Sequence, residues 1–357
     1  MQVIMRDIAV KQGGRGDNLN IHITNIYGQS FTSTALKAQN RVAEVARTMG
    51  YKELGIYSYD MNSDSQEMLY SRIDGIIASV GYGDIVIFQY PAWNGTGFDE
   101  IFVRRLKSYK GLKLIFFVHD IPSLMFENNR YLLGRQIEIL NLAEVVILPS
   151  QAMAEFLVSH GMTVKKIVIQ KMWDFPIPVD GTIRPEFRKV INFAGNPESW
   201  KFGFVKEWKY DQVELRVTAQ EDEWANGRNV SFLGWFNNDI FLVNALRKSG
   251  GFGLVWTDND YWSEYMMLNA NYKISAYLAA GIPVIVNNRI AERETILRKN
   301  LGVALDSLDE AVSKVENMNK AQYNKMADNV AAFSGLIREN YFAKKLLTDA
   351  MFKLLYD

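Results

Sequence analysis

A lysine occupies the start of a predicted helix in the segment "NANYKISAYLAAGIPVIV", residues 269–286. Asn271 is typical of a helix N-cap, which places Lys273 in the first helical turn. A cation is unfavourable there, because the free amide groups and the helix dipole make this end of a helix positive. A bound diphosphate would remove the conflict, so the sequence predicts a phosphate site at Lys273. A solvated lysine on an exposed first turn is the ordinary alternative.

Two further residues in the same half of the chain favour an anion site. In "NFAGNPESWKF", residues 192–202, Asn196 follows a predicted strand and a glycine, and Lys201 lies in the next turn. The glycine would let a ligand approach the backbone closely, and the lysine would supply positive charge. A turn glycine beside a solvated lysine is the structural alternative, which stays open at this point.

A histidine and an aspartate follow a predicted strand in the first half, in "IFFVHDIPSLMF", residues 115–126. His119 or Asp120 could take a proton from an attacking hydroxyl, a role that contributes roughly 10²- to 10⁴-fold to a transfer reaction. Both are therefore candidate general bases. Equally, Asp120 could cap a turn and His119 could be a hydrogen-bonded histidine at a strand end.

Hydroxyl residues follow the first predicted strand, in "ITNIYGQSFTSTA", residues 23–35. Thr34 and the nearby backbone amides could hold a phosphate or a sugar. The structural alternative is that Gly28 serves a turn and Ser33 or Thr34 caps a helix. The segment has neither G-x-G-x-x-G nor a Walker loop, which leaves hydride transfer and P-loop ATPase chemistry weakly supported.

Segments of strand length alternate with amphipathic segments from residue 19 onward, as in βα units around parallel sheets. The first half predicts strands in "LNIHIT", "ELGIY", "DIVIFQYP", "KLIFFVHD" and "EVVILPS", with helices at 34–49, 65–80, 98–109, 130–142 and 151–160. The second half predicts strands in "KVINFAG", "VELRVT", "VSFLGW", "GFGLVW" and "IPVIV", with helices at 200–208, 238–248, 271–280 and 291–299. The predicted fold class is α/β, with two Rossmann-like doubly wound domains and a ligand site at the strand ends in an interdomain cleft.

The overall composition excludes several function classes. The chain has 357 residues, 40 basic and 40 acidic side chains, and no cysteine. The balanced charge gives no reason to expect a nucleic-acid partner, and the missing thiols exclude disulfides and thiolate metal sites. No apolar segment approaches the roughly 20 residues that cross a bilayer. We expect a soluble, cytoplasmic protein, with peripheral membrane association left open.

The four motifs together resemble a known family. "NANYKISAYLAAGIPVIV" is similar to the donor-site segment "N-K-L-x-E-Y-x-A-A-G-x-P-V-I" of GT-B glycosyltransferases. With "ITNIYGQSFTSTALKAQ", "FFVHDIPSL" and "FAGNPESWKF", the chain from residue 20 onward looks like the streptococcal glucosyltransferases that extend glycans on serine-rich repeat adhesins. The resemblance implies metal-independent, inverting transfer of glucose from UDP-glucose to GlcNAc on serine or threonine of the adhesin. A homo-oligomer, with a tetramer among the options, is also expected.

By motif match, the resemblance assigns UDP-sugar contacts to both halves of the chain. The matched residues are Thr34, Asn196, Lys201, Asn271, Tyr272, Lys273, Ile274, Ser275 and Ala276. The proline-rich segment "WDFPIPVDGTIRPEFR" breaks the alternation of strands and helices, which predicts a domain boundary there. The predicted limits are 1–18 for a flexible leader or artificial remnant, 19–174 for the acceptor-side domain, 175–189 for the linker, 190–335 for the UDP-sugar domain and 336–357 for a C-terminal helix that could cross back to the first domain.

One departure from the motif leaves the donor sugar open. Many GT-B enzymes have glutamate where this chain has Ala276, and use it to bind ribose or sugar hydroxyls. Another UDP-hexose, such as a galactosyl donor, is therefore an alternative, as is a non-catalytic UDP-sugar-binding partner of a glycosylation complex. A metal-dependent GT-A enzyme would use Asp258 and Asp260 as a D-x-D element, but two tandem α/β domains do not fit that plan.

Overall fold

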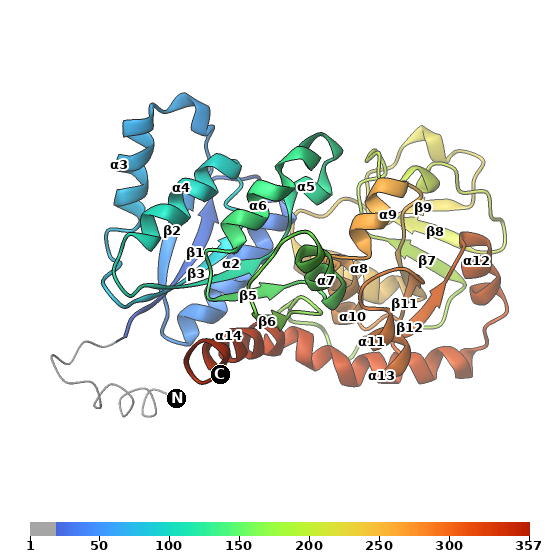
Figure 1. Cartoon of the computed structure of the whole chain (residues 1–357). Helices are drawn as coiled ribbons and strands as arrows, with labels where there is room; N and C mark the ends of the chain where they lie inside the picture. Colours follow the sequence, from blue (N-terminus) through green and yellow to red (C-terminus); the bar gives the residue numbers. More distant parts are fainter. Residues whose placement is uncertain (1–18) are drawn as a thin grey trace. The chain divides into compact units, whose positions relative to one another are not determined.

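The computed structural model describes residues 19–357 (Figure 1). The predicted leader, residues 1–18, lies outside the described residues. The described chain forms two compact units, each with its own parallel sheet. The first unit contains the described residues up to Leu148 together with Leu157–Val168 and Leu347–Asp357, and the second contains Pro149–Phe156 and Ile169–Leu346.

The first sheet has the strand order β2-β1-β3-β4-β5-β6, and its pairs from β2 through β5 are parallel. This is the flavodoxin-like doubly wound order, extended by one strand. Its strands are β1 (Ile21–Tyr27), β2 (Lys52–Tyr57), β3 (Ile85–Tyr90), β4 (Lys113–Val118), β5 (Val145–Leu148) and β6 (Lys166–Ile169). The helices along it are α2 (Thr34–Thr48), α3 (Gln66–Ile76), α4 (Thr96–Lys107), α5 (Pro122–Met125), α6 (Leu133–Leu140) and α7 (Gln151–Ser159), with 3₁₀ turns η2 (Met61–Ser63) and η3 (Glu127–Leu132).

The second sheet has the order β12-β11-β10-β7-β8-β9, with all five neighbouring pairs parallel. Counted from β7, this is the Rossmann order 3-2-1-4-5-6. Its strands are β7 (Val190–Phe193), β8 (Glu214–Val217), β9 (Val230–Phe232), β10 (Phe252–Val255), β11 (Val284–Asn287) and β12 (Gly302–Leu305). The other elements are η4 (Gly203–Val205), η5 (Glu223–Ala225), α8 (Asp239–Ser249), α9 (Asp260–Met266), α10 (Tyr272–Ala280), α11 (Arg293–Arg298) and α12 (Leu308–Glu316).

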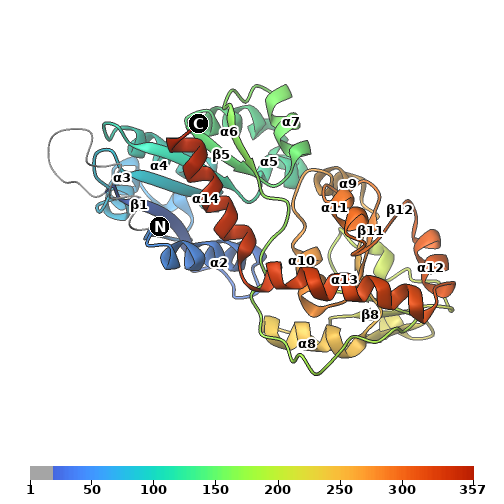
Figure 2. The same cartoon turned by 90° about the horizontal axis from the view of Figure 1, so that it is seen from below.

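Two long helices close the chain, α13 (Lys320–Arg338) and α14 (Tyr341–Leu355), which Figure 2 shows one after the other. The break between them includes Asn340, which has a φ of 59°. A left-handed residue ends a helix, and asparagine tolerates this conformation better than most residues. The helix therefore restarts at Tyr341 rather than at residue 336. No helix among residues 19–357 is long and apolar enough to span a membrane.

The helix predicted at 200–208 is wrong, because this segment contains only the 3₁₀ turn η4. The Thr257 hydroxyl donates to the Lys201 carbonyl at 2.6 Å, which is the carbonyl that an α-helix would pair with the Val205 amide. The Val205 amide instead donates to the Phe202 carbonyl. Instead of a helical bond from Val205, the Lys201 carbonyl accepts from Thr257, which lies in the loop after β10 and more than fifty residues further along the chain.

Sequence patterning missed the edge strands β6 and β12 and the short helices α5 and α9. Both strands have only four residues, and their burial pattern is mixed rather than fully apolar. Helix α9 is seven residues long and begins at the N-cap Asn259, whose side chain accepts from the Trp262 amide at 2.9 Å. Such short segments carry little periodic signal.

Candidate active site

The second sheet reverses its winding direction between the neighbouring strands β7 and β10. In open α/β sheets, ligands bind beyond the carboxyl ends of the strands at such a switch point. The loop after β7 begins at Ala194 and the loop after β10 begins at Trp256. Helix α10 connects back to the parallel strand β11, so its N-terminus also lies at this edge of the sheet.

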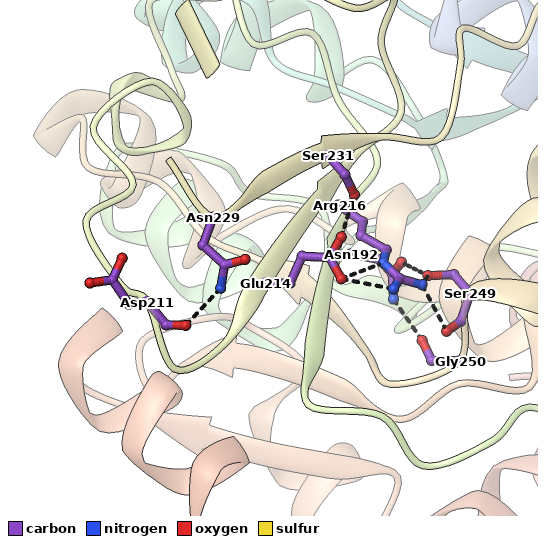
Figure 3. Close-up of polar contacts among 8 residues, drawn as sticks. All are labelled: Asn192, Asp211, Glu214, Arg216, Asn229, Ser231, Ser249 and Gly250. Carbon is purple, nitrogen blue, oxygen red and sulfur yellow. Dashed lines mark hydrogen bonds and ion pairs between the residues drawn. The ribbon is translucent and has the colours of Figure 1, made fainter. Parts of the chain in front are cut away.

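A buried polar network holds β7 beside β10 (Figure 3). The Asn192 side-chain amide donates to the Gly250 carbonyl at 2.7 Å and to the Phe252 carbonyl at 3.0 Å. The Ser249 hydroxyl donates to the Asn192 side-chain oxygen at 2.6 Å, and Arg216 donates to that same hydroxyl. The turn that leads into β10 is thereby attached to β7 and β8, which fixes the strand pair that forms the switch point.

Lys273 lies at the first turn of α10, as the sequence predicted. The Asn271 side chain caps this helix by accepting from the Lys273 amide at 3.0 Å. The Lys273 ammonium lies 4.7 Å from the ring centre of Phe202 and 5.9 Å from that of Phe193. A Cβ at Gly195 would lie 3.3 Å from the Lys273 side chain and closer still to Phe193. The backbone at Gly195 therefore lies directly against the Phe193 ring and the Lys273 side chain.

A second cation, Lys201, lies close enough to affect the first. Its ammonium is 3.4 Å from the ring centre of Trp262 and 5.4 Å from that of Trp200. Burial, followed by the positive charge of Lys201, lowers the pKa of Lys273 to about 8. Two ammonium groups against aromatic faces form a site in which a bound anion would relieve mutual repulsion.

A residue missed by the sequence analysis, Tyr277, ties the two strands together at this edge. Its hydroxyl accepts from the Ala194 amide at 2.7 Å and donates to the Leu254 carbonyl at 3.2 Å. Its ring is fully buried across Gly253, where a Cβ would meet ring atoms at 2.2 Å. The sequence offered one signal for this role, which is that Tyr277 lies one helical turn after Lys273 on the same side of the helix.

The remaining matched residues of this unit contribute less side-chain chemistry. Asn196 is exposed, and its side-chain oxygen accepts from the Glu198 amide in a local turn. Tyr272 is half-buried and packs against Phe175, with ring centres 5.3 Å apart. Ile274, Ser275 and Ala276 are buried in α10. The Ser275 hydroxyl has no hydrogen-bond partner among the described residues, and Ala276 offers no side-chain acceptor for a sugar hydroxyl.

In the first unit, Thr34 begins α2 at the carboxyl end of β1. It is exposed, and the N-cap role belongs to its neighbour Ser33, which accepts from the Leu36 amide. Gly28, with a φ of 81°, forms the turn after the strand. Ser33 therefore caps the helix and Gly28 serves the turn, as the structural alternatives for this loop predicted. Thr34 is exposed at the edge of the sheet.

His119 and Asp120 follow β4 at the carboxyl edge of the same sheet. His119 is buried, and its Nε2 lies 2.9 Å from the Gln89 side-chain oxygen. Burial lowers the pKa of His119 to about 3, so its ring is neutral at physiological pH. Asp120 is half-buried. A neutral imidazole that resists protonation is a poor general base, which leaves the carboxylate as the better suited of the two.

The two acids of the D-x-D element lie in the loop after β10 and at the start of α9. Gly203 approaches Asp258 so closely that a Cβ would lie 2.8 Å from its carboxylate. Asp260 is exposed. Within residues 19–357 no group of three or more histidine, aspartate or glutamate side chains is arranged to hold a metal ion.

These two sheets have the architecture of a GT-B glycosyltransferase. Anabaena HepE in complex with UDP and glucose matches the fold with a TM-score of 0.64 at 11% sequence identity, over 93% of this chain and 99% of HepE. At this identity the likeness concerns the fold. It confirms the fold class that the alternating strands and helices predicted.

The chain belongs to the Glucosyltransferase 3-like family. Residues 20–172 match the N-terminal domain of that family and residues 191–350 match its C-terminal domain. The chain is 44% identical to Glucosyltransferase 3 of Streptococcus gordonii, over 94% of this chain and 100% of the relative. It is 43% identical to Glucosyltransferase 3 of Streptococcus parasanguinis, over 95% and 100%. The family resemblance inferred from the motifs is confirmed, and the protein is a glycosyltransferase.

Proposed function

We propose that this glycosyltransferase moves glucose from UDP-glucose to GlcNAc that is O-linked to a serine-rich repeat adhesin, without a metal ion. The observation that carries the proposal is the lysine pair Lys201 and Lys273 at the switch point of the second sheet. The relatives' name, Glucosyltransferase 3, supports glucose as the transferred sugar. The adhesin acceptor rests on the sequence resemblance.

The chemical need of the reaction is stabilisation of the leaving diphosphate. As the bond between glucose and UDP breaks, negative charge grows on the β-phosphate. Lys273, the free amides of α10 and Lys201 would meet this charge where a GT-A enzyme uses a metal. The two lysines repel each other in the free protein. A bound diphosphate would attract both ammonium groups and would also offset this repulsion.

The acceptor side of the reaction is assigned to the first unit. In the proposed inverting reaction the GlcNAc hydroxyl attacks the anomeric carbon, UDP leaves and the hydroxyl proton passes to a base. Asp120 is the preferred base, because burial keeps the pKa of His119 near 3. Thr34 is proposed to contact the donor from the same sheet edge. We also propose that the enzyme is homo-oligomeric and cytoplasmic, with the domain limits given above.

The experiment that tests this function is a donor and acceptor panel. UDP-glucose, UDP-galactose and UDP-GlcNAc are each supplied with an adhesin repeat peptide that either carries or lacks GlcNAc, with and without EDTA. We expect glucose to be added only to the GlcNAc peptide, at a rate that EDTA leaves unchanged.

Each alternative has its own outcome in this panel. Faster turnover of UDP-galactose than of UDP-glucose would identify galactose as the transferred sugar, and loss of transfer in EDTA would overturn metal independence. UDP binding without hydrolysis or transfer of any donor would instead identify a non-catalytic UDP-sugar-binding protein.

A further inference from the structure

A buried tryptophan, Trp173, holds the main chain at the point where it enters helix α10. Its indole Nε1 donates to the Ala270 carbonyl at 2.8 Å, although the two residues are 97 positions apart in the chain. Both residues are buried, and both belong to the second unit. Ala270 directly precedes Asn271, the N-cap of α10. The hydrogen bond therefore acts just before the helical turn that carries Lys273.

The direction of the Ala270 carbonyl sets the start of the helix, because a peptide unit is planar. This carbonyl and the Asn271 amide belong to one trans peptide unit, so they point in opposite directions. Asn271 has the extended backbone of an N-cap, with φ −77° and ψ 117°. Its side chain accepts from the Lys273 amide at 3.0 Å. Holding the carbonyl thus orients the cap, and the cap orients the turn with Lys273.

The residue after the cap, Tyr272, is held by the same segment. Its ring centre lies 6.2 Å from that of Trp173 and 5.3 Å from that of Phe175. Aromatic pairs at such separations stabilise beyond the area that they bury. Trp173 therefore contacts α10 on both sides of the N-cap, through its N–H before Asn271 and through its ring after it.

A second side chain, Ser150, holds the loop between α9 and α10. The Ser150 hydroxyl donates to the Leu268 carbonyl at 2.6 Å and accepts from the Met153 amide at 3.0 Å. Carbonyls in a buried loop must find donors outside regular structure, and losing such a donor is costly. Ser150 and Trp173 supply these donors for Leu268 and Ala270, so they hold the path of the loop into α10.

The start of α10 needs such support because its electrostatics are unfavourable before a ligand binds. Lys273 is repelled by Lys201 and by the positive end of its own helix. This repulsion favours movement of the first turn away from the second cation. Hydrogen bonds from outside the helix oppose that movement, and a site that is already in place loses less free energy when an anion binds.

We propose that Trp173 and Ser150 are positioning residues that hold the start of α10, and with it Lys273, in the geometry that binds the donor diphosphate. The inference rests on the proposed function for the diphosphate at Lys273. Neither residue contacts the ligand in this assignment. Trp173 acts through Ala270 and Tyr272, and Ser150 acts through Leu268.

The first test compares Trp173→Phe with the matched control Trp208→Phe. Trp208 is also buried in the second unit, and its Nε1 donates to the Val213 carbonyl at 3.2 Å. Each variant removes one indole N–H and keeps an aromatic ring. Urea unfolding measures the stability of each variant. Calorimetry measures its affinity for UDP and, by competition with UDP, for uridine, which has no phosphate.

We expect Trp173→Phe to lower the affinity for UDP about three- to tenfold, as loss of one neutral hydrogen bond would, and to leave the affinity for uridine within about twofold. Trp208→Phe should lose a similar amount of stability and keep both affinities within about twofold. A purely structural tryptophan would not separate UDP from uridine. Unchanged UDP affinity in Trp173→Phe, or an equal loss for UDP and uridine, would overturn the positioning role.

The second test uses Ser150→Ala, which decides the matter if Trp173→Phe does not fold. Its control is Ser334→Ala, because the buried Ser334 hydroxyl donates to the Ala331 carbonyl within α13. UDP affinity should fall in Ser150→Ala alone, again with uridine affinity retained, and equal UDP affinities in the two variants would contradict the proposal.

The variant Lys273→Met separates this inference from the proposed function. If Lys273→Met weakens UDP binding whereas Trp173→Phe and Ser150→Ala do not, only the positioning role fails. If Lys273→Met leaves UDP affinity unchanged, the diphosphate does not bind at α10, and the proposed site fails together with the inference.

Discussion

At the scale of single residues, the site depends on cations held against aromatic rings. Lys273 lies across Gly195 with its ammonium near Phe202, and Lys201 lies over Trp262. Burial of one lysine beside the other opposes its protonation, which is why the pKa of Lys273 falls to about 8. Such a group is charged at neutral pH but becomes neutral under mildly alkaline conditions.

Affinity for UDP should therefore fall above pH 8. A bound diphosphate favours the charged lysine and raises its pKa, so binding takes up a proton between the free and bound pKa values. Below pH 8, Lys273 is already protonated and adds no pH dependence. We expect the Kd for UDP to rise by up to about tenfold per pH unit above pH 8, with proton uptake measured by calorimetry in buffers of different ionisation enthalpy.

The variant Lys273→Met tests this assignment. It should weaken UDP binding about 10- to 100-fold at pH 7, because one charged hydrogen bond of about 1.5–3 kcal/mol is lost. It should also remove the proton uptake. The exposed Lys209 provides a matched Lys209→Met that changes neither property. Near-normal UDP affinity in Lys273→Met would place the phosphates elsewhere.

At the scale of elements, the switch point depends on one helix and two strands. Helix α10 supplies the capped N-terminus with Lys273 and, one turn later, Tyr277, whose hydroxyl bridges the ends of β7 and β10. Because Gly253 has no side chain, the ring can lie directly on the sheet. The helix thus both carries the cation and joins the strand ends beside it.

Tyr277→Phe should destabilise the fold by about 1–2 kcal/mol, because the Ala194 amide loses its partner and the Leu254 carbonyl loses a donor. UDP affinity should fall several-fold as the loop after β7 loosens. Urea unfolding and calorimetry measure the two effects. Tyr323→Phe is the matched control, since this buried hydroxyl donates to the Gly251 carbonyl before β10. We expect Tyr323→Phe to lose a similar amount of stability but to keep its affinity for UDP. An equal loss of UDP affinity in Tyr277→Phe and Tyr323→Phe would contradict a local role for Tyr277.

At the scale of the whole molecule, the proposed chemistry is divided between two compact units with different strand orders. The proposed diphosphate site belongs to the Rossmann-order sheet, and the candidate base and Thr34 belong to the flavodoxin-like sheet. Each group lies at the carboxyl edge of its own sheet, because parallel strands release their following loops there. Donor binding and proton removal should therefore be separable by mutation.

Asp120→Asn tests this division. We expect the rate of glucose transfer to fall by roughly 10²- to 10⁴-fold, because the amide cannot take the hydroxyl proton. The Kd for UDP should stay within about threefold, since the lysine pair is unchanged. Initial rates and calorimetry provide the two measurements. Transfer at more than a tenth of the wild-type rate would exclude Asp120 as the base.

Much of the fold could be predicted because its signals are local. Alternating apolar runs indicated ten of the twelve described strands, and the N-cap Asn271 correctly placed Lys273 in the first turn of α10. Burial, turn chemistry and capping act over a few residues, so they can be read along the chain. The motif around Lys273 likewise indicated the family before any contact was known.

What only the tertiary structure decided depends on residues far apart in the sequence. The segment 200–208, predicted as a helix, forms only η4, and its Lys201 carbonyl accepts from Thr257 in the loop after β10. Tyr277 acquires a role only because β7 and β10 become neighbours, and Trp173 holds the start of α10 only because folding brings Ala270 beside it. The sequence determined which groups could bind and react, whereas long-range packing determined their neighbours and hence their charge.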